Sequence, residues 1–565
     1  MVAVGTDGDG IACAQLDAEG TVLRRESIDR VALSGLARTA VDVRWVWSDT
    51  AHWYPSLLDA GVRVRRCRDL RLCHAILRDS TLVAEPAAVR AARAWDVAAE
   101  VDSGAAPPAL FAIAESAGEA APPHDLDEVL AELARQRDAV ASAAERGRLE
   151  LLCAAESAGA LVAAEMRAAG LPWDVAAHER ILEDVLGRRP AGGGMPEHMT
   201  ALAAEIRRHL GDAQASLDSP AKLLRSLHRI GVQAESTSRW ELRRFEHPVI
   251  APLLEYKRQS RLLVANGWAW LDEWVHDGRF RPVYVPAGVV TGRWASSGGG
   301  ALQIPRLLRE AVRADDGWTF VVADVAQLEP RVLAGMSSDA ALARAAFGRD
   351  LYAGIVDSGA VATRAEAKVA MLGAMYGATT GESGRLVPRL RRAYPRAMKL
   401  VDDAARTGEL GGVVSTWLGR SCPPASEGWQ RAQRQAAGET GSAMDRDRAR
   451  RAAGDRGRFT RNFVVQGTAA EWALAWLGEV RSRLESLGSV GAGETAPRSG
   501  PAMADRAHLA FFLHDELIVH TPVRQADAAA AIVREAAASA GRLLFGGFAI
   551  DFPLDLKIAP TAAKE

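Results

Sequence analysis

Residues 507–520 read Ala507-His508-Leu509-Ala510-Phe511-Phe512-Leu513-His514-Asp515-Glu516-Leu517-Ile518-Val519-His520. Two apolar runs flank a short charged tip, and this pattern predicts a buried β-hairpin that holds the carboxylate of Asp515 at its turn. Burying a carboxylate costs several kcal/mol unless a cation offsets its charge. The alternative is a surface hairpin with a solvated turn, because Asp is a common turn residue. A second carboxylate at the end of another apolar strand would favour the buried hairpin.

Asp324 supplies that second carboxylate. It follows five strand-type residues, Thr319 to Ala323, and a helical pattern comes after it. Two acids at the tips of buried strands repel each other unless they share metal ions. Paired carboxylates that hold two divalent ions about 3.5–4 Å apart are the arrangement that two-metal phosphoryl transfer requires. Asp324 and Asp515 are therefore candidate metal ligands.

A predicted helix between these two acids carries a basic face. Thr363 and Glu366 form a capping-box pattern at its start, and Gly377 can end it. Four residues recur every four positions and so share one face: Arg364, Lys368, Leu372 and Tyr376. Cationic side chains one turn apart near a helix start suit a polyphosphate. The alternative is a solvated basic stripe.

The composition sets broad limits on function. The 565 residues predict two or more domains, and a hydrophobic content of 48% is ample for large cores. The formal net charge of -2 gives no support to nucleic-acid binding, so any such site must come from local clusters of Arg and Lys. The five cysteines are scattered without zinc-ligand spacing, and no signal-peptide pattern or membrane-spanning run is recognisable. We therefore expect a cytoplasmic protein with reduced cysteines and no membrane association.

Changes in pattern divide the chain into segments. The N-terminal part mixes helical patches with short strand-type runs and ends in Pro-rich linker sequence. The strand-type runs lie at 2–4, 11–16, 43–46 and 62–64, and the linker sequence lies at 105–108 and 120–123. The next part, 125–276, is almost entirely helical in pattern. It is broken at Gly192–Gly194, and Ser219 is a good N-cap before Pro220.

Strand patterns return in the second half of the chain, at 280–285, 319–323 and 509–513, with helices between 340 and 406. Two stretches have the composition of flexible insertions. Residues 423–456 are rich in Arg, Asp, Gly and Gln, and residues 488–504 are rich in Gly, Ala, Pro and Ser.

The ordered motifs resemble the family A DNA polymerases, the DNA polymerase I type, from about residue 156 to the end. The family's motif A usually reads Asp-Tyr-Ser-Gln-Ile-Glu-Leu-Arg, and residues 324–331 read Asp-Val-Ala-Gln-Leu-Glu-Pro-Arg. The basic helix resembles motif B, and His514-Asp515-Glu516 resembles motif C. Flanking family signatures are matched at 291–297, 302–305, 458, 462 and 466–470.

This resemblance implies an α+β multidomain fold. It would be a right-hand polymerase, with an antiparallel palm sheet and helical fingers and thumb, preceded by a ribonuclease-H-like α/β exonuclease-type domain. The implied divisions are a degenerate 3′–5′ exonuclease-like domain at 1–124, connecting helices and thumb at 125–276, palm with motif A at 277–335, fingers with motif B and a flexible insertion at 336–455, and palm with motif C at 456–565.

The implied activity is template-dependent addition of deoxynucleotides to a primer 3′-hydroxyl by two-metal-ion phosphoryl transfer. The implied partners are primer-template DNA and deoxynucleoside triphosphates, and the implied cofactor is two Mg²⁺ ions, with Mn²⁺ able to substitute. We expect a monomer of the bacterial nucleoid that serves in DNA repair or gap filling.

The resemblance also assigns roles to individual residues. Metal ligands would be Asp324, Asp515 and the Val325 carbonyl. Arg364 and Lys368 would grip the triphosphate, with Lys368 as proton donor to pyrophosphate, and Glu329 would exclude a ribose 2′-hydroxyl. Further nucleotide contacts would be Gln327, Tyr352, Leu372 and Tyr376. Contacts to the DNA minor groove and the primer end would be Arg293, Arg458, Asn462, Gln466 and His514.

The chain departs from the family pattern at several positions. Leu372 replaces an aromatic residue beside the incoming sugar, and Tyr352 stands where a phosphate-contacting His is usual. Pro330 lies within the motif A helix, which is tolerable only in its first turn. These changes remove no metal ligand, so we expect them to affect speed and fidelity more than activity.

The N-terminal domain departs further. Its first acidic motif is reduced to Asp7 and Asp9, and Cys73 stands where a second motif should carry an acid. We therefore expect a degenerate, structural domain, and no 5′-nuclease domain. Three alternatives stay open: a bifunctional polymerase with residual 3′–5′ exonuclease, a primer-template binding protein that has lost turnover, and a single-subunit RNA polymerase. Glu329 and the His-Asp-Glu motif favour DNA over RNA synthesis.

Overall fold

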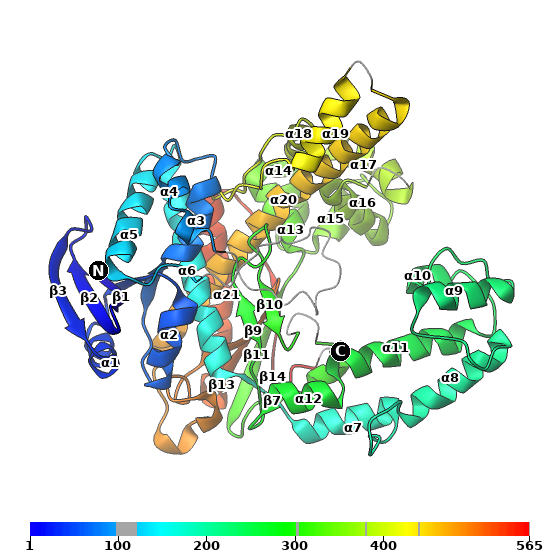
Figure 1. The fold of residues 1–565 in the computed structure, drawn as a ribbon, viewed down its shortest axis with the longest axis horizontal. Helices are drawn as coiled ribbons and strands as arrows, with labels where there is room; N and C mark the ends of the chain where they lie inside the picture. Colours follow the sequence, from blue (N-terminus) through cyan, green and yellow to red (C-terminus); the bar gives the residue numbers. More distant parts are fainter. Residues whose placement is uncertain (98–120, 301–303, 379–380, 439–440, 564–565) are drawn as a thin grey trace. The chain divides into compact units, whose positions relative to one another are not determined.

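The computed structural model describes residues 1–97, 121–300, 304–378, 381–438 and 441–563 (Figure 1). The linker expected at 105–108 lies outside these residues. The chain forms two compact units. The first contains Met1–Gly170, Pro282–Leu302 and Asp315–Ala559, and the second contains Leu171–Arg281, Gln303–Ala314 and Pro560–Glu565. In the part of the chain that is described, no helix has both the length and the apolar character needed to cross a bilayer.

The first unit begins with a mixed five-stranded sheet of order β3-β2-β1-β4-β5. Strand β1 pairs antiparallel with β2 and parallel with β4, and β4 pairs parallel with β5. The strands are β1 (Val2–Asp7), β2 (Gly10–Leu16), β3 (Val22–Ile28), β4 (Arg44–Trp47) and β5 (Arg66–Asp69). The helices of this part are α1 (Arg30–Thr39), α2 (Thr50–Asp59), α3 (Leu70–Asp79), α4 (Ala87–Ala91), η1 (Arg93–Trp95), α5 (Leu126–Ala141) and α6 (Arg146–Ala169).

One expectation for this sheet was wrong, and one strand was not predicted. The strand expected at 62–64 lies instead at Arg66–Asp69, because Val62 and Val64 are buried in the loop before it. Strand β3 had no prediction, because it is an edge strand with mostly exposed residues and lacks the apolar alternation of a half-buried strand. The strands expected at 2–4, 11–16 and 43–46 are confirmed to within a few residues.

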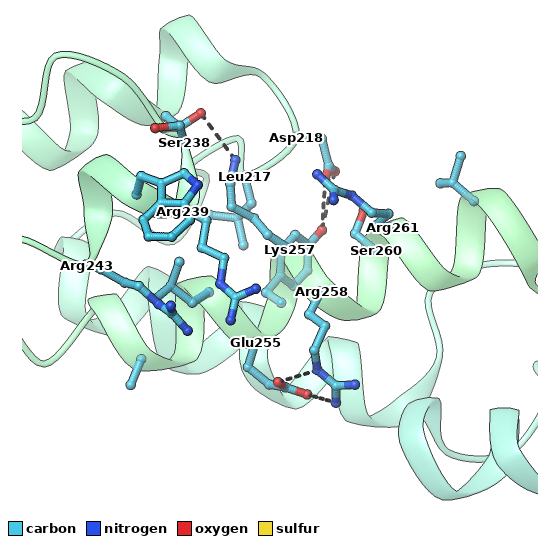
Figure 2. Close-up of a pocket in the computed structure, with 16 residues that line it drawn as sticks. Leu217, Asp218, Ser238, Arg239, Arg243, Glu255, Lys257, Arg258, Ser260 and Arg261 are labelled. Carbon is cyan, nitrogen blue, oxygen red and sulfur yellow. Dashed lines mark hydrogen bonds and ion pairs between the residues drawn. The ribbon is translucent and has the colours of Figure 1, made fainter. Parts of the chain in front are cut away.

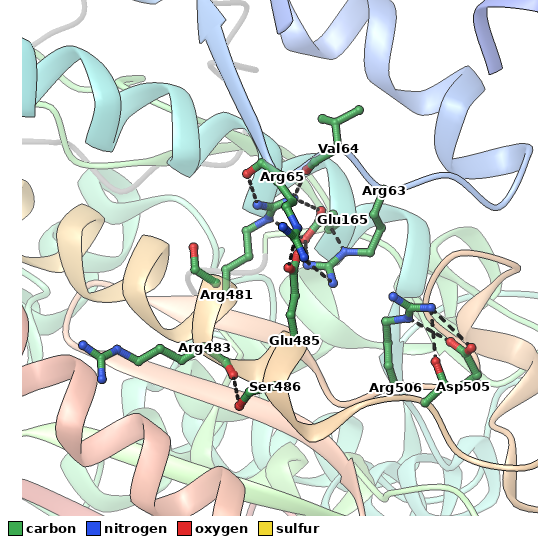
Figure 3. Close-up of polar contacts among 12 residues, drawn as sticks. Arg63, Val64, Arg65, Glu165, Arg481, Arg483, Glu485, Ser486, Asp505 and Arg506 are labelled. Atoms are coloured by element: carbon green, nitrogen blue, oxygen red, sulfur yellow. Dashed lines mark hydrogen bonds and ion pairs between the residues drawn. The ribbon is translucent and has the colours of Figure 1, made fainter. Parts of the chain in front are cut away.

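A buried ion cluster fastens α6 to the N-terminal sheet and to the long helix α20 (Ala443–Leu484) (Figure 3). Glu165 of α6 accepts hydrogen bonds from Arg63 at 3.1 Å, from Arg481 of α20 at 2.6 Å and from the Tyr54 hydroxyl at 2.6 Å. Burial alone would raise the pKa of Glu165, but the two guanidinium groups outweigh it and lower the pKa to about 2. Arg481 also donates to the carbonyl of Arg65, so the cluster joins three parts of the chain.

The palm-type sheet is antiparallel, in the order β12-β13-β11-β14. The hairpin expected at 507–520 is confirmed as β12 and β13, and the strand expected before Asp324 is confirmed as β11. Central β11 is buried on both faces, which explains its uninterrupted apolar run. The strands of this sheet are β11 (Trp318–Val325), β12 (His508–Leu513), β13 (Glu516–Pro522) and β14 (Leu554–Ala559). The helices that belong to this part of the chain are η4 (Glu485–Leu487), η7 (Val523–Gln525) and α21 (Ala526–Phe545). A separate two-stranded pair consists of β9 (Val283–Val285) and β10 (Ala295–Gly298).

Helices between the two palm segments enclose their own core, centred on Met371, Met375, Tyr394 and Met398. The capping box of Thr363 and Glu366 and the left-handed Gly377 that ends the basic helix are confirmed. The helices are α13 (Leu328–Ser337), α14 (Ala340–Ala346), α15 (Leu351–Asp357), α16 (Arg364–Tyr376), α17 (Gly381–Ala393), α18 (Pro395–Glu409) and α19 (Glu427–Ala437).

The prediction that residues 423–456 and 488–504 are flexible insertions was wrong for the residues that the structure describes. Most of 423–456 is helical, because it holds α19 and the first third of α20, whose start is fixed by a capping box of Ser442 and Asp445. Alternating charges suit an exposed helix, and Arg450 pairs with Asp447 one turn away. Residues 488–504 contain η5 (Ala492–Glu494) and η6 (Pro497–Ser499), and Met503 is fully buried in the core of the N-terminal sheet.

The second unit confirms the helical pattern before residue 276. Its long helices α8 and α11 run side by side (Figure 1). The glycine break lies between α7 and α8, and Ser219 is the N-cap of α9 with Pro220 in the first turn. The elements are β6 (Leu171–Pro172), α7 (Val175–Leu186), α8 (Glu197–Leu210), α9 (Pro220–Arg229), α10 (Arg239–Leu242), α11 (Ile250–Asn266), α12 (Trp268–Trp274), β7 (Val275–His276), β8 (Arg279–Phe280) and η3 (Arg306–Ala311).

Candidate active site

The sheet register brings the two predicted metal ligands together. Asp324 lies opposite Glu516 in the β11–β13 ladder, so it faces the hairpin tip that carries Asp515. The backbone N–H of Val325 donates to the Asp515 carbonyl at 2.9 Å, which fixes the tip against the end of β11. His514 adopts a left-handed conformation with φ of 56°, as the tight turn requires.

The electrostatics of this pair favour a bound cation. Burial, and secondly the charge of Asp324, raise the pKa of Asp515 to about 6. A divalent ion between two such carboxylates would relieve both effects, and hard carboxylate oxygens are the ligands that Mg²⁺ prefers. Among the described residues no group of three His, Cys, Asp or Glu side chains could hold a metal, so the remaining ligands would have to come from backbone, water or substrate phosphates.

Glu329 is the residue predicted to exclude a ribose 2′-hydroxyl, and we call it the gate. Its carboxylate is held by Arg293, a predicted DNA contact, and by Tyr376, a predicted nucleotide contact. The Arg293 guanidinium pairs with its carboxylate at 2.5 Å, and the Tyr376 hydroxyl donates to both of its oxygens at 3.0 and 3.2 Å. Burial, and secondly the charge of Glu329, raise the pKa of Tyr376 to about 12, so the phenol stays a donor at neutral pH. Pro330 occupies the first turn of α13, where a missing N–H costs no helical hydrogen bond.

Asp350, which the sequence prediction missed, links three of the predicted nucleotide contacts. Asp350 caps α15, accepts from Gln327 at 3.0 Å and pairs with Arg364 at 2.8 Å. The Arg364 guanidinium also lies over the Tyr352 ring, 5.5 Å from its centre. Burial would raise the pKa of Asp350, but the hydrogen bond from Arg364 and those of the helix start lower it overall.

The basic face of α16 points away from the helical core. Arg364 and Lys368 are exposed, and Leu372 and Tyr376 are half-buried, whereas the opposite face packs with Met371 and Met375. Lys368 makes no hydrogen bond or ion pair with the described residues, which leaves its ammonium group available to a ligand.

The predicted DNA contacts fall into two sets. Gln466 accepts from the Thr291 hydroxyl at 2.9 Å, and His514 and Arg293 line one small hollow with Phe512. His514 is exposed at the surface, yet the loss of solvation in this hollow and the charge of Arg293 lower its pKa. The other two lie apart from this hollow. Arg458 is exposed and pairs with Asp455, and Asn462 is only 3% exposed, so their roles stay predictions.

Two further features escaped sequence reasoning. Arg331 is fully buried and binds Asp551 at 2.6 Å and the Ala326 carbonyl at 3.0 Å, which holds the loop after Asp324 in place. In the second unit, a hollow of about 1000 Å³ is lined by Arg239, Arg243, Lys257, Arg258 and Arg261 (Figure 2). The three cations on α11, Lys257, Arg258 and Arg261, lie within five positions of one another, and this cluster is the local signal in the sequence.

In the part of the N-terminal domain that the structure describes, Asp7, Asp9 and Asp69 do not form a group of acids that could hold a metal. Asp7 and Asp9 are exposed at the end of β1. Asp69 is fully buried and accepts from the backbone N–H groups of Leu72 at 2.9 Å and Thr50 at 2.8 Å, so it serves to cap α3. Cys73 is also fully buried. Asp69 and Cys73 therefore have structural roles here, and the degenerate character of the domain stays a prediction.

The sheet is antiparallel, with one carboxylate at the end of β11 and another in the adjoining hairpin turn, and the Tyr376–Glu329 hydrogen bond links the motif A segment to a helix with an exposed basic face. This is the palm and fingers arrangement of right-hand polymerases. The chain belongs to DNA polymerase family A, whose sequence profile matches residues 192–561. The fold is similar to the POL domain of Pol1 from M. smegmatis, solved in complex with DNA primer-template and dNTP. The TM-score is 0.68 at 19% identity, covering 100% of this chain and 95% of that one. The expected α+β right-hand fold is therefore confirmed.

Curated relatives include the thermostable DNA polymerase I of Thermus filiformis, 26% identical over 361 residues, which is 58% of this chain and 38% of that protein. The enzyme of the same name from Thermus aquaticus is 25% identical over 438 residues, 70% of this chain and 46% of that protein. DNA polymerase I of Chloroflexus aurantiacus is 29% identical over 344 residues, 56% of this chain and 32% of that protein. The matches span less than half the length of these relatives.

Proposed function

We propose that this protein is a DNA-directed DNA polymerase that adds deoxynucleotides to a primer 3′-hydroxyl. The observation that carries the proposal is the meeting of Asp324 and Asp515 at one end of the two central strands, with the pKa of Asp515 raised by burial and by its neighbour. Membership of DNA polymerase family A supports it, as does the likeness to a Pol1 domain whose structure was solved with primer-template and dNTP.

Asp324, Asp515 and the Val325 carbonyl would hold two Mg²⁺ ions, and Mn²⁺ could replace them. Bound Mg²⁺ would supply the charge that activates the primer hydroxyl and neutralises the phosphates. The triphosphate would displace Asp350 from Arg364 and recruit the exposed Lys368, because phosphate oxygens compete with a carboxylate for a guanidinium. Lys368 would also donate the proton that the leaving pyrophosphate takes up.

Glu329 would occupy the space that a ribose 2′-hydroxyl needs, held there by Arg293 and Tyr376. Arg293 and Gln466 would meet purine N3 and pyrimidine O2 acceptors, which every correct pair offers in the minor groove. His514 would lie at the primer end. The basic hollow of the second unit would bind duplex phosphates, since its cations outnumber its acids, Asp218 and Glu255.

Template-directed extension tests this proposal. A 5′-labelled primer on four templates, one for each templating base, should be extended by the complementary deoxynucleotide only, and chelation of Mg²⁺ should stop the reaction. Untemplated addition, or equal use of ribonucleotides, would contradict it. The repair or gap-filling role, the monomeric state and the nucleoid location stay predictions.

A further inference from the structure

A short hairpin between α18 and α19, residues 414–422, sits inside the first unit; we refer to it as the brace hairpin. Its two arms are closed by hydrogen bonds from the N–H of Thr416 to the Arg420 carbonyl at 2.8 Å and from the N–H of Cys422 to the Val414 carbonyl at 3.0 Å. The hairpin touches the N-terminal domain on one side and the candidate active site on the other.

On the side of the N-terminal domain, the loop after α3 forms hydrogen bonds with the tip and the arms of the brace hairpin. The Ser80 hydroxyl donates to the Gly419 carbonyl at 2.7 Å, and the Thr81 hydroxyl shares a hydrogen bond with the Ser415 hydroxyl at 2.7 Å. The backbone N–H of Thr81 also donates to the Ser421 hydroxyl at 2.9 Å. The fit at the tip is close. Gly419 has φ of 111°, and a Cβ there would lie 2.6 Å from the Leu82 side chain. A larger residue at this position would require the Leu82 side chain or the tip to shift, and its positive φ would strain the backbone.

On the second side, the hairpin packs against the backbone next to two predicted minor-groove contacts. A Cβ on Gly292 would lie 2.6 Å from Nε of Arg420, so that guanidinium directly supports the turn that presents Arg293. A Cβ on Gly467 would lie 2.4 Å from the Thr416 methyl group, so Thr416 packs against α20 beside Gln466. The two glycines leave the hairpin in direct contact with both backbones.

Buried charges hold the hairpin in this position. Arg420 is 8% exposed and pairs with Glu156 of α6, which is fully buried. Glu471 of α20 is also buried, and it accepts from the Thr416 hydroxyl and from the N–H of Leu418 at 2.9 Å. The hairpin therefore has little freedom to move independently of α6 and α20.

We propose that the N-terminal domain serves as a brace. Through Ser80, Thr81 and the brace hairpin it positions Arg293 and Gln466 against the minor groove of the primer end. Arg420 is a positioning residue in this scheme and touches no substrate. The inference rests on the proposed polymerase function. According to this inference, the N-terminal domain contributes to the check of base-pair geometry by positioning Arg293 and Gln466, and it needs no catalytic activity to do so.

The test replaces the primer-terminal guanine by 3-deazaguanine, in which a C–H replaces the N3 acceptor. An enzyme that donates a hydrogen bond to N3 should lose about tenfold in kcat/KM on this primer, the effect of one hydrogen bond to a charged donor. In the Ser80→Ala/Thr81→Val variant the donors are less well placed, so the loss should shrink to about twofold. Ser34→Ala is the matched control, because that buried serine bonds to the Arg30 carbonyl within α1, away from the hairpin.

Each outcome decides a separate point. No primer extension by the parent protein would refute the polymerase function itself. Extension with no penalty on 3-deazaguanine would overturn the groove contacts, and an equal penalty in parent and double variant would overturn the brace. If the double variant melts at a lower temperature than the parent, Arg420→Lys takes its place. It keeps the charge beside Glu156 but lacks the guanidinium beneath Gly292, and the same reduced penalty is expected.

Discussion

The Tyr376 hydroxyl gives a quantitative test of the predicted gate. It donates to both oxygens of Glu329, so Tyr376→Phe leaves Arg293 as the carboxylate's remaining partner in the gate. A hydrogen bond to a charged acceptor contributes about 1.5–3 kcal/mol, and the half-buried position of Tyr376 favours the lower figure. About 1.5 kcal/mol corresponds to roughly tenfold, and we expect preference for deoxynucleotides over ribonucleotides to fall by that factor.

The assay measures kcat/KM for single incorporation of dCTP and CTP opposite a template guanine. Tyr394→Phe is the control, because its hydroxyl bonds to Ser358 in the helical core at 2.8 Å. We expect the control to keep the parent's dCTP to CTP ratio. A Tyr376→Phe enzyme with the parent's ratio would refute the idea that this hydroxyl fixes the gate, and an unchanged ratio in Glu329→Ala would refute the gate itself.

Three more expectations concern stability, sugar recognition and DNA affinity. Glu165→Gln should lower the free energy of unfolding by about 3–5 kcal/mol in urea titrations followed by Trp fluorescence, because it removes the buried carboxylate that pairs with both Arg63 and Arg481 and leaves only Glu485, 3.9 Å from Arg63, nearby. The pKa of Glu165 falls from its ordinary 4.5 to about 2 in the folded protein. The parent should therefore keep the stabilisation from this ionised carboxylate above pH 4.5 and lose it as the pH falls toward 2. The Glu165→Gln variant should lack this pH dependence. Leu372→Phe should change dideoxynucleotide incorporation by about fivefold, because a ring adds about 1 kcal/mol of packing on the sugar; equal incorporation would refute this. Replacing Arg239, Arg243 and Lys257 by Gln should reduce the slope of log Kd against log salt by about 1 per cation, measured by fluorescence anisotropy with duplex DNA, and an unchanged slope would exclude the hollow as a phosphate site.

Sequence patterns predicted those parts of the site whose structure is determined by neighbouring residues in the chain. The hairpin tip at Asp515, the strand before Asp324 and the capped helix of Arg364 each have their pattern within about fifteen residues, and all three are confirmed. Alternating apolar residues, a capping box and a C-terminal glycine act on the backbone where they occur.

Other features depend on contacts between distant segments and left no local pattern. Asp350 meets Gln327 and Arg364 only after α13, α15 and α16 have packed, and Arg331 finds Asp551 across 220 positions of sequence. The charged composition at the start of α20 predicts a flexible insertion, because such composition is typical of disorder, whereas in the structure its charges pair along an exposed helix face.

The most direct measurement of the central claim is the single-turnover rate of dNTP incorporation by the parent, Asp324→Asn and Asp515→Asn on one primer-template in Mg²⁺. Asparagine keeps the size of each side chain but removes the charge that would hold the metal. The account predicts templated incorporation by the parent and a fall of at least about a thousandfold, roughly 4 kcal/mol, in each variant. Incorporation that survives either substitution with a rate near the parent's would contradict it.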